Sequence, residues 1–185
     1  MTIDKNEANR SLIDKINKLE QESNQEFSYA QKILLTTDGS VTAILDVLFG
    51  KITLTTIEQH FDIADSEHAK LVNVEEGEEI NFREVIMHRN GKPLIYAISH
   101  IPLKRCSKEV CGDLVRADIP IGRILKNYHI ESRREINNIW IEKPNALLKE
   151  IFKTDEDMLA RDYVIINNDE ILMWIKEVFP ISYFR

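Results

Sequence analysis

The sequence has few of the residues that build metal sites, disulfide frameworks and membrane spans. Its two cysteines, Cys106 and Cys111, lie five positions apart in a predicted helix, a spacing that fits neither a C-x-x-C pair nor a disulfide framework. The five histidines form no His-x-x-x-His pair, so local spacing predicts no metal site. Charges interrupt every apolar stretch before the roughly 20 residues that a bilayer requires, and the first residues, MTIDKNEANR, contain no apolar signal core. We therefore expect a cytoplasmic protein with structural thiols, no metal and no membrane partner.

Phosphate-binding and nucleophile motifs are also missing. There are only 6 glycines, and the chain contains no Gly-x-Gly-x-x-Gly, Walker or Gly-x-Ser-x-Gly pattern. Its 24 basic and 31 acidic residues give a net charge of −7, which disfavours sequence-independent nucleic-acid binding. With 185 residues, 43% of them hydrophobic and 30% charged, the chain is typical of one globular domain over residues 1–185.

The first 80 residues change between helical and strand patterns. Residues 1–26 carry apolar side chains at helical spacing, which predicts an N-terminal helical extension. A second helix is predicted to follow a capping residue, Asp38 or Ser40, and to end at Gly50. Residues 51–61, KITLTTIEQHF, predict a strand, and the acidic stretch 58–79 is interpreted as a solvated edge or loop.

Two β-rich runs joined by Asn90-Gly91 predict a hairpin with a two-residue turn. That turn predicts the following cross-strand pairs: Arg89 with Lys92, Met87 with Leu94, Val85 with Tyr96, and Arg83 with Ile98. Arg83 then lies on an apolar face, where a guanidinium must reach water or find an anion. We leave two interpretations open: an internal salt bridge or exposure at the sheet edge, and binding of a ligand carboxylate.

A second hairpin is predicted at the C-terminus, with its turn at residues 167–169. On one face of its last strand we expect Ile171, Met173, Ile175, Glu177 and Phe179. A buried carboxylate is costly unless it is paired, and desolvation raises its pKa toward values useful for proton transfer. Glu177 is therefore expected either to pair with Arg83 across the core or to share one ligand with it.

The region between the hairpins carries the basic residues that balance the acidic stretch: Lys104, Arg105, Lys108, Arg116, Arg123, Lys126, Arg133 and Arg134. They fit a solvated face, or a surface that steers an anionic substrate toward a cleft. Within this region Asp118 is a candidate cap for a short helix that carries Ile121.

Five segments together resemble the chorismate pyruvate-lyase family and its archaeal relatives, in the family's order and near its spacing. They are ILLTTDGSVT, KITLTTIEQHF, REVIMHRNGKPLIYAISHIP, PIGRIL and RDYVIINNDEILMWIKEVFP. The resemblance covers most of the chain after residue 33. It implies an α+β fold in which an antiparallel sheet of about six strands and helical flaps enclose a buried ligand cavity.

The resemblance also implies a set of site residues. Arg83 matches the family arginine that binds the ring carboxylate of an aromatic acid, and Glu177 matches the glutamate that meets the ring hydroxyl. Ile121, in PIGRIL, matches a position whose backbone amide helps to hold the carboxylate, and Val41, in GSVT, falls near the remaining backbone contact.

One position departs from the family. Bacterial members carry Gly-Arg on the second hairpin strand where this chain has Ala97-Ile98, so Arg123, Arg161 or His100 would have to bind a second carboxylate.

The activity implied by the resemblance is a cofactor-free elimination of pyruvate from chorismate, which gives 4-hydroxybenzoate. Arg83 would anchor the substrate and stabilise charge, and Glu177 would orient the hydroxyl and act as a base, unless the hydrogen moves intramolecularly. The expected partner is a small aromatic carboxylate, with the oligomeric state left open.

Two alternatives remain. The same fold occurs as the effector-binding domain of some transcription regulators, so the alternative activity is a non-catalytic binder or sensor of aromatic acids. Only about 30 residues precede the family core, too few for a DNA-binding winged helix. A structural protein in which Arg83 and Glu177 merely pair is the other alternative.

Overall fold

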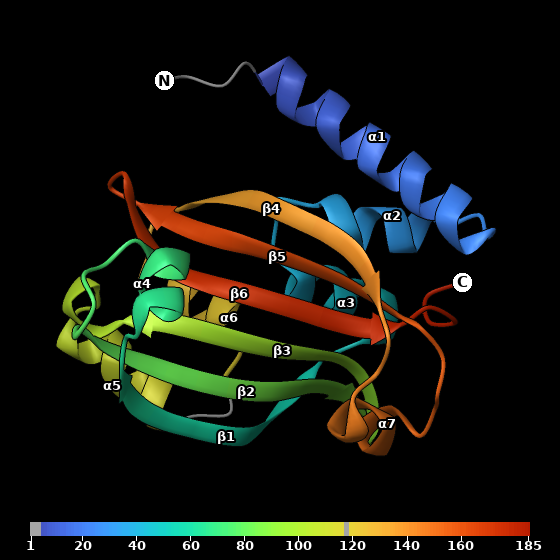
Figure 1. The fold of residues 1–185 in the computed structure, drawn as a ribbon. Helices are drawn as coiled ribbons and strands as arrows, with labels where there is room; N and C mark the ends of the chain where they lie inside the picture. The colour runs from blue at the N-terminus through green and yellow to red at the C-terminus, as the bar shows by residue number, and fades with distance from the viewer. Residues whose placement is uncertain (1–4, 117–118) are drawn as a thin grey trace.

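The computed structural model describes residues 5–116 and 119–185, and one antiparallel sheet organises them (Figure 1). Its strands are β1 (Thr53–Ile63), β2 (Glu79–Arg89), β3 (Lys92–Pro102), β4 (Arg133–Glu142), β5 (Met158–Asn167) and β6 (Glu170–Pro180). The helices are α1 (Lys5–Ser23), α2 (Tyr29–Thr36), α3 (Val41–Phe49), α4 (Ser66–Val72), α5 (Lys108–Arg116), α6 (Ile121–Asn127) and α7 (Ala146–Phe152), with a 3-10 turn at Leu103–Arg105. The sheet order is β1-β2-β3-β6-β5-β4, so the two predicted hairpins meet at its centre.

Helices cover both faces of this sheet. On one face, α2 and α3 pack over one end of the strands and α5 and α6 over the other, and each pair of helices closes its own apolar cluster. Helices α4 and α7 cover the opposite face, where they pack around Trp174 and Val178 respectively. These observations confirm the α+β sheet with helical flaps.

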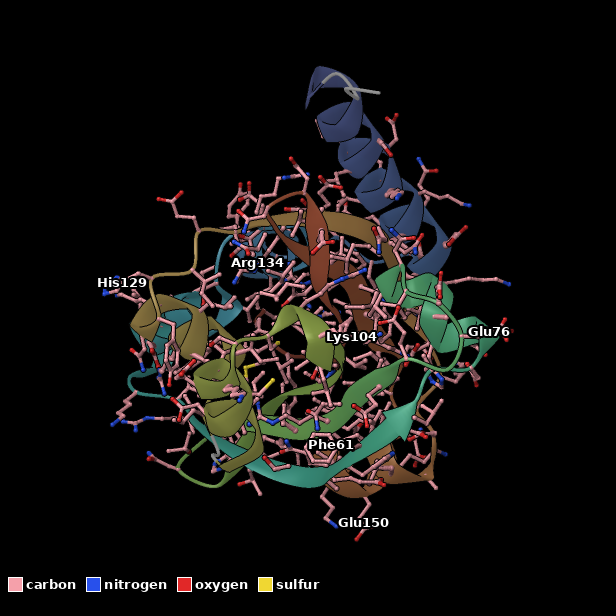
Figure 2. The ribbon with its side chains drawn as sticks, turned by 90° about the vertical axis from the view of Figure 1, so that its left-hand side faces the viewer. Phe61, Glu76, Lys104, His129, Arg134 and Glu150 are labelled. Carbon is pink, nitrogen blue, oxygen red and sulfur yellow. The ribbon has the colours of Figure 1, made fainter. Side chains whose placement is uncertain are left out.

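The N-terminal helix packs at the β4 edge of the sheet. Ile16 and Leu19, in its second half, are buried in the same cluster as α2 and α3, and Lys15 Nζ donates to the Asn137 carbonyl at 2.9 Å. Its first half extends beyond the sheet (Figure 2). None of the described helices is both long enough and apolar enough to cross a membrane.

Ser40, rather than Asp38, is the N-cap residue of α3. Its Oγ accepts from the Ala43 amide at 3.3 Å, and Gly50 ends α3 at a φ of 82°, a region that glycine enters without strain. The cap fixes the N-terminal turn of α3 against the sheet.

The Asn90-Gly91 hairpin forms, but its predicted register is wrong beyond the turn. Arg89 pairs with Lys92 as expected, whereas Met87 pairs with Ile95, because Leu94 is an extra residue in a β-bulge. Arg83 consequently faces Ser99 instead of Ile98. One extra residue moves every later partner to the other face of the sheet.

A similar irregularity corrects the face predicted for the last strand. Ile165 pairs with Met173 and Ile166 with Ile171, so Leu172 is the extra residue in the ladder. Ile171 therefore packs into the Trp174 cluster under α4, on the face opposite Glu177. The positions from Met173 to Phe179 keep the predicted face.

The acidic stretch and the cysteine region also differ from the predictions. Helix α4 forms within the stretch interpreted as an edge or loop, because Asp65 caps the amides of Glu67 and His68 and the helix buries apolar side chains on the sheet. Cys106 follows the 3-10 turn and Cys111 lies in α5, so the two cysteines do not share one helix.

Candidate active site

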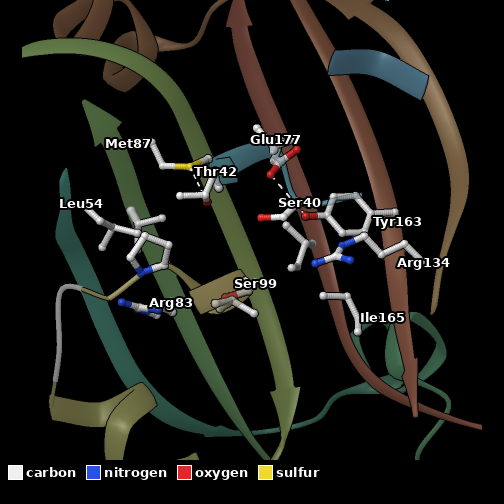
Figure 3. Close-up of a pocket in the computed structure, with 17 residues that line it drawn as sticks. Ser40, Thr42, Leu54, Arg83, Met87, Ser99, Arg134, Tyr163, Ile165 and Glu177 are labelled. Atoms are coloured by element: carbon white, nitrogen blue, oxygen red, sulfur yellow. Dashed lines mark hydrogen bonds between the residues drawn. The ribbon is translucent and has the colours of Figure 1, made fainter. Parts of the chain in front are cut away.

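A buried cavity of about 50 Å³ lies between the sheet and the N-terminal turns of α3 and α6 (Figure 3). Its walls are largely aliphatic, with Val85, Met87 and Ala97 among the residues contributed by the central strands. The polar side chains that line it are Ser40, Thr42, Arg83, Ser99, Arg134, Tyr163 and Glu177. A mostly apolar pocket with a few convergent polar groups is typical of small-molecule sites.

Arg83 is held at one side of the cavity. Its side chain is 1% exposed, and its two terminal nitrogens donate to the Ile119 carbonyl at 3.2 and 3.3 Å. Ile119 lies two residues before the first residue of α6, so this arginine lies beside the start of the flap. Burial excludes the interpretation that Arg83 escapes to water.

The predicted backbone contacts come from the two flaps. Ile121 is the first residue of α6, with Pro120 at the cap position, and the expected cap Asp118 lies outside the described residues. Val41 is the first residue of α3, and both residues line the cavity. First-turn amides have no acceptor within their own helix, so these N–H groups are suited to a ligand oxygen.

Glu177 pairs with a different arginine from the one predicted. Arg161 Nε donates to Glu177 Oε2 at 2.7 Å, and the Tyr163 hydroxyl donates to Oε1 at 3.2 Å. No ion pair joins Glu177 to Arg83 in the described part of the chain, so the predicted Arg83–Glu177 pair is wrong. The reason is the sheet order, since β5 lies beside β6 whereas β3 separates β6 from β2.

The Glu177 pair is almost completely buried. The side chains of Arg161 and Glu177 are 1% and 6% exposed, and Arg161 Nη1 also donates to the Thr37 carbonyl at 2.9 Å. Burial would lower the pKa of Arg161, but the Glu177 carboxylate beside it raises that pKa overall. Burial, followed by the Glu177 charge, raises the pKa of Tyr163, so the phenol stays protonated and donates.

The two flaps touch each other across the cavity at Gly122. A Cβ built on this glycine would come 2.7 Å from Ser40 Oγ, which is closer than real side chains approach. Glycine at this position therefore lets the first turns of α3 and α6 meet over the ligand space.

The three residues expected to replace the family's second cation do not line the cavity. Arg123 forms a two-oxygen salt bridge with Asp46 at 2.8 Å. His100 is buried on the other face beside Trp174, and burial lowers its pKa to about 4, which leaves it neutral. Arg161 supports Glu177, and Ile98 itself packs on the face covered by α4 and α7.

The cavity-lining arginine that sequence reasoning missed is Arg134, at the edge strand β4. It was grouped with the basic region and given no role in a site. Arg134 stands two residues before Ile136 and so shares its face, a period-2 signal that could have placed it toward the sheet's inner side.

Metal-binding groups are not gathered at this cavity. Over residues 5–116 and 119–185, no group of three His, Cys, Asp or Glu side chains is arranged to hold a metal ion. Among the residues that the structure describes, the charged side chains that line the cavity are Arg83, Arg134 and Glu177.

Solved structures of transcription regulators share this fold. The effector domain of PhnF from Mycobacterium smegmatis superposes with a TM-score of 0.64 at 14% identity, covering 79% of this chain and 91% of that one. A GntR-family regulator from Bacillus cereus gives a TM-score of 0.59 at 12% identity, covering 72% of this chain and 94% of that one. At these identities the likeness concerns the fold alone.

Sequence comparison defines the family. The profile described as "Chorismate pyruvate-lyase Rv2949c-like" matches residues 35–185, and the chain belongs to this family. "Putative lyase MJ0807" of Methanocaldococcus jannaschii is 40% identical over 158 residues, which are 82% of this chain and 78% of that protein. The chorismate pyruvate-lyase of Mycobacterium tuberculosis is 24% identical over 161 residues, 83% of this chain and 81% of that protein.

Proposed function

We propose that this protein is a chorismate pyruvate-lyase, which eliminates pyruvate from chorismate and leaves 4-hydroxybenzoate. The observation that carries the proposal is one buried cavity lined by both Arg83 and Glu177, with the first turns of two flap helices above them. The family assignment supports lyase chemistry in this cavity. A cytoplasmic location, a single domain and cofactor-free turnover stay predictions.

In this proposal Arg83 binds the ring carboxylate, and the Ile121 amide contributes a second hydrogen bond. A planar guanidinium matches the two oxygens of a carboxylate, and the beginning of α6 adjoins Arg83 through Ile119. The Val41 amide, on α3, provides a contact from the opposite flap. Fixed donors in a site closed to water stabilise charge more strongly than donors in solution.

Glu177 accepts the hydrogen bond of the ring hydroxyl in the proposed complex. Both of its oxygens already accept hydrogen bonds, one from Arg161 and one from Tyr163, which fixes the carboxylate in position. We therefore assign Glu177 an orienting role, with the ring hydrogen passing directly to the enolpyruvyl methylene. In that step a C–H and a C–O bond break, the new methyl C–H bond forms, and the ring becomes aromatic.

Substrate entry requires the flaps to move. A cavity of about 50 Å³ holds a few water molecules at most, and chorismate is larger. Outward movement of the first turns of α3 and α6 would enlarge the space without changing the sheet. Closure over the substrate would then exclude water from the reaction.

The decisive experiment follows 4-hydroxybenzoate and pyruvate together after chorismate is added to the purified, metal-stripped protein. We expect equal amounts of both products above the spontaneous rate. The variant Arg83→Ala should lose roughly 10²–10³-fold in kcat/KM, the range measured for fixed charge-stabilising donors. Unchanged 4-hydroxybenzoate binding by Arg83→Ala would contradict its role as the anchor.

Asp162 offers a matched control for Glu177. It is a buried carboxylate on the neighbouring strand, but it faces the opposite side of the sheet and accepts from Trp174 at 2.8 Å. We expect Glu177→Gln to impair turnover and Asp162→Asn to retain it. No turnover in the unmodified protein, together with saturable 4-hydroxybenzoate binding, would overturn the lyase assignment and support a binder of aromatic acids.

A further inference from the structure

We propose that Arg134 binds the second carboxylate of a dianionic ligand in this cavity and so favours the substrate over the monoanionic product. The inference deepens the proposed function, since it names the group that recognises the part of chorismate that leaves. Arg134 comes from β4, four strands from Arg83 on β2. At about 4.8 Å a strand, the two backbones are roughly 19 Å apart along the sheet, and Figure 3 shows the side chains on different sides of the cavity.

Arg134 has the weakest internal contacts of the arginines near the site. The hydrogen bond from Arg134 Nη1 to the Asp38 carbonyl measures 3.4 Å, which is long. Its Nε is buried, and no described residue accepts from it. By contrast, Arg123 and Arg161 each hold a carboxylate at 2.7 to 2.8 Å.

No carboxylate of the described residues neutralises Arg134 within salt-bridge distance. The carboxylate that lines the cavity, Glu177, already pairs with Arg161, so it does not balance the Arg134 charge. One positive charge therefore remains, which a ligand anion can balance. The Arg134 charge also lowers the pKa of Tyr163, against the larger raising effects of burial and Glu177, so it acts on the same enclosed space.

The surroundings of the guanidinium fit an anion rather than a further protein contact. A Cβ at Gly122 would lie 4.0 Å from Arg134 Nη2, which places this nitrogen beside the junction of the two flaps. Helix α3 begins at the same junction, with Ser40 as its N-cap residue. A side chain at position 122 would fill this space, and glycine leaves it open.

The position of this charge relative to Glu177 explains the expected selectivity. In the proposed complex the ring hydroxyl meets Glu177, and the enolpyruvyl ether is attached to the adjacent ring carbon. Its carboxylate would therefore lie at the Glu177 end, toward Arg134 and away from Arg83. The product 4-hydroxybenzoate has no group there, so Arg134 contributes little to its binding.

The test compares two ligands by calorimetry: 4-hydroxybenzoate, a monoanion, and 3-(carboxymethoxy)-4-hydroxybenzoate, a stable dianion with an ether-linked carboxylate. Arg134→Gln should raise the Kd of the dianion about tenfold or more, as expected for hydrogen bonds to a charged group, and leave the Kd of 4-hydroxybenzoate within about twofold. Arg134→Lys should restore part of the dianion affinity because it keeps the charge. Arg133→Gln, on the same strand but paired with Glu135 and Asp169 at the surface, is the matched control and should change neither Kd.

Equal loss of affinity for both ligands, or no loss for the dianion, would overturn the inference. The proposed lyase activity is judged separately, by turnover of chorismate in the unmodified protein. If the unmodified protein turns over chorismate but Arg134→Gln weakens the binding of both ligands equally or of neither, only the inference about Arg134 is overturned. If Arg134→Gln weakens dianion binding selectively but the unmodified protein does not turn over chorismate, only the lyase assignment is overturned. Failure of the unmodified protein to bind either ligand would overturn both.

Discussion

Replacing Arg161 by Met should destabilise the protein strongly, because it leaves the Glu177 carboxylate buried without its partner. The two side chains are 1% and 6% exposed, and their nitrogen and oxygen atoms are 2.7 Å apart. Removing one member of such a buried pair costs about 3–5 kcal/mol, since the remaining charge is no longer compensated. This cost is a large part of the roughly 5–15 kcal/mol that holds a typical domain folded.

The loss in the free energy of unfolding should come from the buried charge of Glu177 rather than from lost packing. In Arg161→Met the folded protein takes up a proton at the lone carboxylate more readily than the unfolded chain does. By linkage, the destabilisation then grows as the pH rises from 5 to 8. Arg161→Met/Glu177→Gln, which carries no buried charge, should recover part of the loss and show no such pH dependence.

Urea unfolding at pH 5 and pH 8 measures these differences in the free energy of unfolding. Arg133→Met is the control, because Arg133 pairs with Glu135 at the surface, where both side chains are more than half exposed, and little change is expected. A loss below about 1 kcal/mol for Arg161→Met would refute the reasoning, as would a double variant no more stable than the single one.

Three further predictions concern the pKa of His100, the contact at Gly122 and the transfer of the ring hydrogen. The pKa of His100 is lowered to about 4, so as the pH falls from 6.5 toward 4 the unfolded state binds a proton that the folded state does not. Over that range the free energy of unfolding of the unmodified protein should fall by up to about 3 kcal/mol more than that of His100→Phe, since one pH unit is worth about 1.36 kcal/mol. Denaturation experiments in which the two proteins show parallel pH dependence would refute this. Gly122→Ala should lower the free energy of unfolding by about 1 kcal/mol, because the added Cβ displaces the Ser40 side chain that caps α3. The same substitution should cost much less in a Ser40→Ala background, and a double-mutant cycle with additive effects would contradict the contact. Finally, pyruvate trapped as it forms in D₂O should carry no deuterium in its methyl group if Glu177 only orients the hydroxyl, whereas one deuterium would indicate transfer through a base.

The sequence by itself determined the local elements and the placement of two charged residues, Arg83 and Glu177, on apolar strand faces. Asn90-Gly91 specifies a two-residue turn wherever it lies, because both positions favour positive φ, and the hairpin forms as predicted. The period-2 pattern also places Arg83 and Glu177 on strand faces that turn inward, and both prove to be buried. The five family segments predicted the family and its sheet with flaps, which the comparisons confirm.

Only the tertiary structure decided which charges meet. The register of each hairpin depends on one bulged residue, Leu94 or Leu172, and both of these side chains are buried in the core clusters. Sheet order then determines the partners: β5 brings Arg161 to Glu177, and β4 brings Arg134 to the cavity from residues distant in sequence. Such contacts depend on the arrangement of several strands at once, so no spacing within one segment of the chain could have predicted them.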